Sequence, residues 1–92
     1  MTQIELEFYK SHRYTCLTNI NGKVCGLMRF AFTTGLVVGL HKFGYQGRYC
    51  FHTLAEATEA LLIWDGQGHP SGNWIKYKGD VEISNPNYDS GN

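Results

Sequence analysis

A chain of 92 residues is expected to form one domain, because so short a chain cannot divide its hydrophobic core in two. Hydrophobic residues make up 42% of it, charged residues 17%, and its formal net charge is zero, which excludes a disordered chain. Membrane helices and secretory signals are not expected, since no apolar run is long enough and the first residues lack a basic start. We therefore expect a cytoplasmic protein without a membrane partner, whose three cysteines stay reduced.

The first predicted element is a strand near the N-terminus. Ile4, Leu6 and Phe8 alternate with glutamates, and this period of two residues is typical of a half-buried edge strand. Further along, β-branched and apolar residues over 36–41 and 44–51 continue the strand pattern after turn-forming residues. The first half of the chain is therefore expected to form an antiparallel meander.

A β-hairpin is predicted around Asn21-Gly22, since both residues readily adopt the positive φ angles of a type I′ turn. In this hairpin Ile20 should face Lys23, and Cys16 should face Leu27. One face is then expected to carry Tyr14, Cys16, Ile20, Cys25 and Leu27. The other face is expected to carry Leu17, Val24, Met28, Phe30 and Phe32. Because both faces hold apolar residues, we expect the sheet to be in contact on both sides.

One helix is predicted, over residues 54–65. It begins with a capping box, in which the Thr53 oxygen accepts from the Glu56 amide and the Glu56 side chain reaches back to the Thr53 amide. Gly66 suits the left-handed position that follows a last helical turn. The apolar stripe that should pack on the sheet consists of Leu54, Ala57, Leu61 and Trp64.

A glycine-rich loop over 66–73 and a last strand or hairpin over 74–83 complete the predicted fold. Trp64 and Trp74 should be core residues, and Ile75 should pack under the helix while Lys76 and Lys78 face solvent. The fold class is thus α+β, an antiparallel sheet of four to six strands with one helix packed on one face. Residues 1–84 should form the domain, and residues 85–92 a flexible tail.

The spacing that catalytic, metal and phosphate sites need is missing. The glycines of 66–72 follow a helix C-terminus, whereas phosphate-binding glycines lead into a helix N-terminus. Only Cys50 and His52 resemble a pair of metal ligands, and a base two residues from a thiol on one strand is not in line with it. We therefore expect a protein that is not an enzyme and that has no catalytic residue, no cofactor and no metal.

Charge divides the chain into two halves. Residues 1–52 hold six basic and two acidic residues, a net charge of +4, whereas residues 53–92 hold two basic and six acidic ones, a net charge of −4. Aromatic residues interleave with the basic ones, a pattern typical of proteins that bind single-stranded nucleic acid. Tyrosine, tryptophan and arginine also anchor protein interfaces, where a partner protein or a second copy covers them.

Protein binding is the leading prediction, and binding of single-stranded nucleic acid is the alternative. A homodimer is also compatible with an exposed aromatic edge, because a second copy would cover it. The candidate partner-binding residues are Tyr9, Arg13, Tyr14, Arg29, Tyr45, Arg48, His69, Lys76 and Lys78.

A resemblance covers about a third of the chain, over residues 49–57, 61–70 and 72–79. Its recurring part follows the short helix and reads W-D-G-x-G-x-P-x-G-x-W-I-K-x-K-G, from Trp64 to Gly79. This segment resembles small proteins encoded by bacteriophages and prophages. The resemblance implies a phage accessory protein in the host bacterial cell, similar in size to anti-CRISPR proteins that disable host defence by occupying a surface of their target. The implied partner is a host or phage protein, such as a CRISPR-Cas component.

Overall fold

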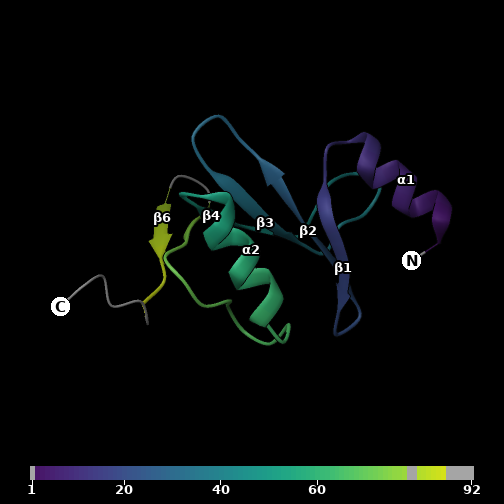
Figure 1. Ribbon diagram of the computed structural model, residues 1–92. Helices are drawn as coiled ribbons and strands as arrows, with labels where there is room; N and C mark the ends of the chain where they lie inside the picture. Colours follow the sequence, from purple (N-terminus) through teal and green to yellow (C-terminus); the bar gives the residue numbers. More distant parts are fainter. Residues whose placement is uncertain (1, 79–80, 87–92) are drawn as a thin grey trace.

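A computed structural model describes residues 2–78 and 81–86 of the chain. These residues form one antiparallel sheet of six strands, in the order β1-β2-β3-β4-β5-β6, with two helices (Figure 1). The elements are α1 (Gln3–Ser11), β1 (Thr15–Ile20), β2 (Lys23–Arg29), β3 (Thr34–Val38), β4 (Gly47–Phe51), α2 (Leu54–Ile63), β5 (Ile75–Lys78) and β6 (Val81–Ser84). The predicted α+β class and the antiparallel meander are confirmed. No helix in the described part of the chain is long and apolar enough to cross a membrane.

The predicted N-terminal strand is wrong, because these residues form α1. Thr2 caps this helix, since its hydroxyl oxygen accepts a hydrogen bond from the Glu5 amide at 3.2 Å. Tyr9 is the buried residue of α1, and its hydroxyl donates to the Leu40 carbonyl oxygen at 3.3 Å. Ile4 is 81% exposed, so the alternation of apolar and acidic residues does not mark a buried strand face.

The predicted hairpin is confirmed at its turn and wrong at its far end. Asn21 and Gly22 have φ angles of 52° and 85°, and Ile20 faces Lys23. The register then shifts between Thr15 and Thr18, so that Thr15 rather than Cys16 faces Leu27. Cys16 is exposed with a φ angle of 52°, which is the local irregularity that a bulge introduces.

Two groups of buried side chains lie on the two faces of the sheet. The first group packs against α2 and contains Cys25, Leu27, Leu36, Val38, Tyr49, Phe51, Ala57, Ala60, Leu61 and Trp74. The second group contains Tyr9, Tyr14, Val37 and Leu40, with Leu17, Val24, Met28 and Tyr45 packed against it. The register shift moves Tyr14 to the second group, against Tyr9 of α1, and so corrects its predicted face. In Figure 1, α2 lies over the middle of the sheet, and α1 lies beyond β1 at one end of the molecule.

Helix α2 begins where its capping box predicts and ends two residues early, at Ile63. The Thr53 oxygen accepts from the Glu56 amide at 3.1 Å, as predicted. The Glu56 carboxylate accepts from the Thr53 hydroxyl at 3.0 Å, rather than from the Thr53 amide as predicted. Leu54 was expected in the buried stripe and is instead 47% exposed, because Ala57, Ala60 and Leu61 form the packed face. Gly66 has a φ angle of 86°, as predicted for the residues that end the helix.

Trp74 is fully buried on the α2 side, and its indole N–H donates to the Pro70 carbonyl oxygen at 2.7 Å. Adjacent residues of a strand face opposite ways, so a buried Trp74 directs Ile75 away from α2. Ile75 also pairs with Cys50, and paired residues of neighbouring strands lie on the same face of the sheet. The prediction that Ile75 packs under the helix is therefore wrong. Lys76 therefore lies on the α2 side, where it is half-buried rather than facing solvent as predicted, and its Nζ is 4.4 Å from the centre of the Tyr49 ring.

The predicted tail starts at a residue that contacts the domain. The Asn85 side-chain amide donates to the Gly72 carbonyl oxygen at 2.8 Å, and its backbone N–H donates to the Trp74 carbonyl oxygen at 3.3 Å. Residues 87–92 of the predicted tail lie outside the described residues.

Candidate interaction surface

The second face of the sheet is hollowed over β4 and β5, where neither helix covers it. Strands β4 and β5 share a single residue pair, Cys50 with Ile75, so their other ends are not held together by pairing. A hollow of about 310 Å³ and a second of about 180 Å³ meet at Arg48 and Tyr77, which line both. We call this surface the aromatic groove, and it is lined by Phe30, Ala31, Phe32, Thr33, Tyr45, Gln46, Gly47, Arg48, Cys50, Ile75, Lys76 and Tyr77.

Arg48 is held in place at the centre of the aromatic groove. Its guanidinium carbon lies 4.6 Å from the centre of the Phe30 ring, and its Nη1 donates to the Tyr45 hydroxyl at 3.1 Å. It forms no ion pair with any residue that the structure describes. A cation that is already oriented and lacks a carboxylate partner loses little side-chain entropy when it binds a ligand.

Gly35 of β3 lies beneath this arrangement. A Cβ atom at Gly35 would be 2.5 Å from the Phe30 ring and 3.3 Å from the Arg48 side chain. The missing side chain therefore gives the phenyl ring and the arginine stem room to lie against the sheet. Three elements position the stacked arginine and ring, since Gly35 comes from β3, Arg48 from β4, and Phe30 from the loop after β2.

On the α2 side of β4, an aromatic cluster anchors the glycine-rich loop. The Tyr49 hydroxyl lies 2.6 Å from Nδ1 of His69, and the Tyr49 ring meets the Trp74 ring edge-on at 4.8 Å between centres. Burial raises the pKa of Tyr49, so its phenol stays protonated, and this hydroxyl and the His69 ring nitrogen share one hydrogen bond. Lys76 lies over the Tyr49 ring on the α2 face and also lines the smaller hollow of the aromatic groove, which lies between the unpaired ends of β4 and β5 and so is reached from both faces.

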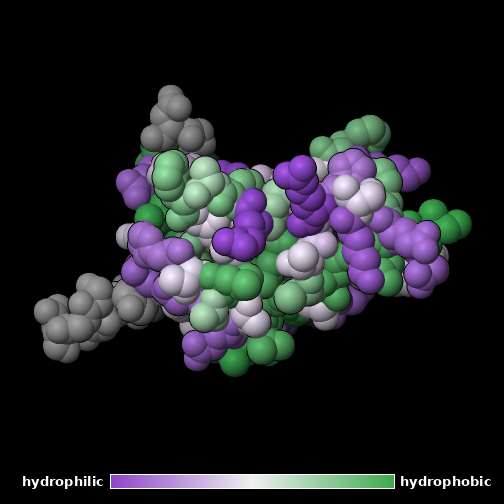
Figure 2. Space-filling view, turned by 45° about the horizontal axis from the view of Figure 1, so that its top comes forward, coloured by the Kyte–Doolittle hydropathy of each residue, from purple (hydrophilic) through white to green (hydrophobic). Residues whose placement is uncertain are grey.

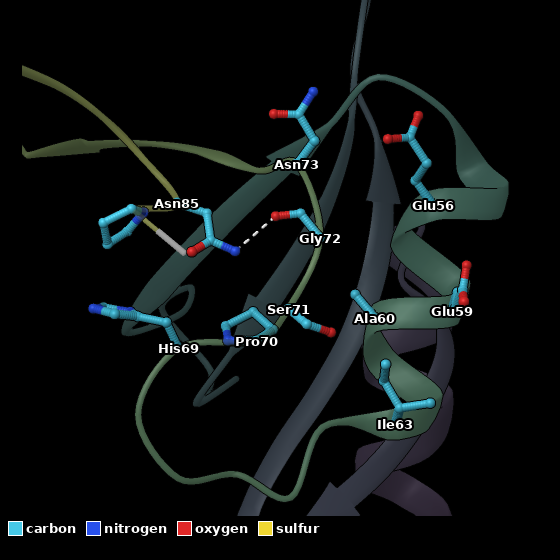
Figure 3. A pocket seen from close by; sticks show the side chains of 11 residues that line it. Glu56, Glu59, Ala60, Ile63, His69, Pro70, Ser71, Gly72, Asn73 and Asn85 are labelled. Atoms are coloured by element: carbon cyan, nitrogen blue, oxygen red, sulfur yellow. Dashed lines mark hydrogen bonds between the residues drawn. The ribbon is translucent and has the colours of Figure 1, made fainter. Parts of the chain in front are cut away.

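A third hollow, of about 630 Å³, separates α2 from the loop of residues 69–73. Figure 3 shows Glu56 and Glu59 on the helix side, with Pro70 and Asn85 across from them. Lysine and arginine are absent from its described lining, so we call it the acidic hollow. It does not resemble a metal site, because no three His, Cys, Asp or Glu side chains in the described ranges could hold an ion together.

Apolar side chains are exposed at many places on the molecule. Figure 2 shows hydrophobic and hydrophilic residues interleaved on the face that it presents. The exposed large apolar residues are Ile4, Phe8, Phe32, Phe43, Leu54, Leu62, Ile63, Tyr77, Val81 and Ile83. The aromatic groove is therefore distinguished by its combination of aromatic rings and cations rather than by hydrophobicity alone.

The structure brings together three of the predicted partner-binding residues, Tyr45, Arg48 and Lys76, at the aromatic groove. Tyr9 and Tyr14 are buried in the second core group. The remaining ones do not line the groove: Arg13 and Arg29 are exposed elsewhere, His69 lines the acidic hollow, and the Lys78 side chain lies outside the described part.

Sequence reasoning missed Ile75 and Tyr77 as groove residues because it placed the last strand in the wrong phase. It also did not select Phe30 and Phe32, although the hairpin alternation already assigned both to one face with Met28, and in the structure that face lies opposite α2. That alternation, combined with the position of Phe32 in a turn, was the signal that could have identified them.

Comparison with known proteins gives no relative: no protein-family model matches the sequence, and no curated protein or solved structure is significantly similar to it. The aromatic groove offers a fixed cation, a second cation and several exposed rings, and such groups make non-covalent contacts.

Proposed function

We propose that the protein is a non-enzymatic binding protein and that the aromatic groove is its binding surface. The observation that carries this proposal is the placement of Arg48, which is stacked on Phe30, hydrogen-bonded to Tyr45 and not paired with a carboxylate. The few residues that carry most of the binding energy in protein interfaces are enriched in arginine, tyrosine and tryptophan. Phe32, which is 93% exposed at the rim of the groove, adds an apolar contact.

The partner that we propose is a protein of a bacterial host, and the role is that of a phage or prophage accessory protein acting against host defence. This part of the proposal comes from the resemblance of residues 64–79, with an anti-CRISPR inhibitor in the host cytoplasm as its most specific form. Several residues of that segment have structural roles. Pro70 accepts the Trp74 indole hydrogen bond, and Gly66 and Gly72 adopt positive φ angles.

The described side chains also support a protein without catalytic activity. Burial raises the pKa of the Cys25 thiol, which disfavours the thiolate that a nucleophile needs. Glu56 accepts a hydrogen bond from Thr53 in the cap of α2, so it is engaged in structure.

Single-stranded nucleic acid is the second candidate partner. The observation that favours it is the absence of carboxylates from the described lining of the aromatic groove, which has Arg48 and Lys76 beside tyrosine rings. Phosphates would contact the cations, and bases would stack on the rings.

The two candidates are separated by capture from a bacterial lysate with the wild-type protein and two variants as bait. Tyr77→Ala removes an exposed ring of the groove, and Leu62→Ala removes an exposed apolar side chain on α2, across the sheet. We expect a protein that is captured by the wild type and by Leu62→Ala but not by Tyr77→Ala. Equal capture by all three baits would place the interface elsewhere.

Titration with single-stranded oligonucleotides at two salt concentrations completes the test. Binding that weakens steeply as salt rises, together with no captured protein, would replace the protein partner by nucleic acid.

A further inference from the structure

The two edges of the sheet differ in how open they are to another strand. Strand β1 is irregular, because its register shifts between Thr15 and Thr18. Strand β6 is regular, its four residues are all exposed, and no strand in the described part of the chain pairs with its outer side (Figure 1). A regular exposed edge is a template for pairing with another chain.

Hydrogen bonding shows which backbone groups of β6 point outward. The Asn85 N–H donates to the Trp74 carbonyl oxygen, and these residues stand opposite each other in the register that pairs Ile75 with Ser84. Hydrogen-bonded pairs alternate along an antiparallel ladder, so Ile83 is bonded to Lys76 in β5. The backbone N–H and C=O groups of Glu82 and Ser84 therefore point away from the sheet.

The side chains of β6 divide between the two faces. Glu82 pairs with Tyr77 and Ser84 with Ile75, which places both side chains on the face of the aromatic groove. Val81 and Ile83 lie on the α2 face, where α2 does not reach β6, and Val81 is 62% exposed.

We propose that β6 pairs antiparallel with β6 of a second copy of this chain, about a two-fold axis at Ile83. In this register Glu82 of each copy stands opposite Ser84 of the other, and each such pair exchanges both of its outward backbone hydrogen bonds. The two Ile83 residues then form a non-hydrogen-bonded pair, the type of antiparallel pair in which the side chains lie closest together.

The neighbouring registers are disfavoured by particular residues. A shift that centres the axis on Glu82 places the two carboxylates opposite each other, which is repulsive. A shift that centres it on Ser84 places Glu82 opposite Pro86, the next outward position, and proline has no N–H to donate. A shift by one residue would put the apolar side chains of one copy on the polar face of the other.

The pairing has a consequence for the aromatic groove. A two-fold axis perpendicular to the sheet keeps the same face of both copies on one side. The dimer would therefore present two aromatic grooves side by side on one face of a continuous sheet.

Sedimentation equilibrium of the full chain over a wide concentration range tests this pairing. Ser84→Lys places a lysine opposite each Glu82 of the second copy, and we expect the dimer dissociation constant to fall about fivefold. Ser84→Glu places carboxylates opposite each other, and we expect the constant to rise by about the same factor. Gln67→Lys and Gln67→Glu make the same charge changes at an exposed loop residue and should leave it unchanged.

The proposal would be overturned if the wild-type chain stayed monomeric at concentrations up to about 1 mM, because a weaker dimer would not count as association. It would also be overturned if the two Ser84 variants shifted the constant in the same direction, or by no more than the Gln67 variants. Neither result affects the proposed groove function, because Ser84 does not line the groove.

Discussion

The Tyr49 hydroxyl and the His69 imidazole are joined by a hydrogen bond of 2.6 Å between strand β4 and the glycine-rich loop. Trp74 packs against both rings, with centres 4.8 Å from Tyr49 and 5.2 Å from His69. The loop is thus attached to the sheet by aromatic contacts and one polar bond. This attachment fixes the phase of β5, and with it the side chains that β5 contributes to the aromatic groove.

We predict that the stability of the protein falls at high pH through the ionisation of Tyr49. Burial raises its pKa in the folded state, whereas in the unfolded state the pKa is about 10. Below that pH the phenol is protonated in both states, and its ionisation has no effect on stability. As the pH rises through 10, the unfolded chain loses the proton first, so the free energy of unfolding decreases. Urea denaturation at pH values from about 7 to about 11, which span the unfolded-state pKa, measures this decrease in the free energy of unfolding.

Tyr49→Phe is the control for that prediction. It removes the hydrogen bond to His69 and should cost about 1 kcal/mol at neutral pH. It should also make the loss of stability at high pH smaller than in the wild type, although Tyr14, whose pKa is raised mainly by burial, still contributes. A variant that loses stability between neutral and high pH by the same amount as the wild type would show that Tyr49 ionises equally in both states.

Trp74→Ala should destabilise the protein by about 3–5 kcal/mol, since it leaves a cavity and removes a buried hydrogen-bond donor. Phe32→Ala, at a side chain that is almost fully exposed, should change stability by less than about 0.5 kcal/mol. Chemical denaturation of both variants compares the two effects. If Trp74→Ala unfolded at the same denaturant concentration as the wild type, Trp74 would not be the core residue that the structure shows.

Much of the fold could be predicted from local signals, and the errors arise where two signals compete. Thr53 and Glu56 predict the start of α2, and Thr2 and Glu5 have the same spacing and cap α1. In the second case the alternation beginning at Ile4 also fits a strand, but the capped helix forms, with Tyr9 as its buried residue. The register shift near Cys16 leaves no sequence signal, because its positive φ angle occurs at a residue that rarely adopts one.

The candidate surface was less predictable, because it depends on the phase of one short strand. Once Trp74 is assigned to the core, alternation directs Lys76 toward α2, and Ile75 and Tyr77 toward the other face. The sequence interpretation placed Trp74 and Ile75 on one side, which a strand cannot do. The contact between Arg48 and Phe30 could not be derived, since it depends on the pairing of β3 with β4 and on the space above Gly35.

Gly35→Ala should weaken partner binding more than it weakens folding. The added methyl group would meet the outer edge of the Phe30 ring, which can swing away, and would then leave Arg48 without its stacking partner. We expect a loss of stability of about 1 kcal/mol and a clear loss of affinity for the captured partner. Denaturation and binding isotherms on the same preparation compare these effects. A variant that keeps full affinity would show that the stacked arginine is not needed for recognition.

The most direct test of the aromatic groove is the affinity of the captured partner for Arg48→Ala, compared with Lys10→Ala, by isothermal titration calorimetry. Both substitutions remove one positive charge, and Lys10 is exposed on α1 outside the groove. The account predicts that Arg48→Ala weakens binding about tenfold or more, as loss of an interface anchor does, while Lys10→Ala binds like the wild type. Equal affinities for the two variants would contradict it.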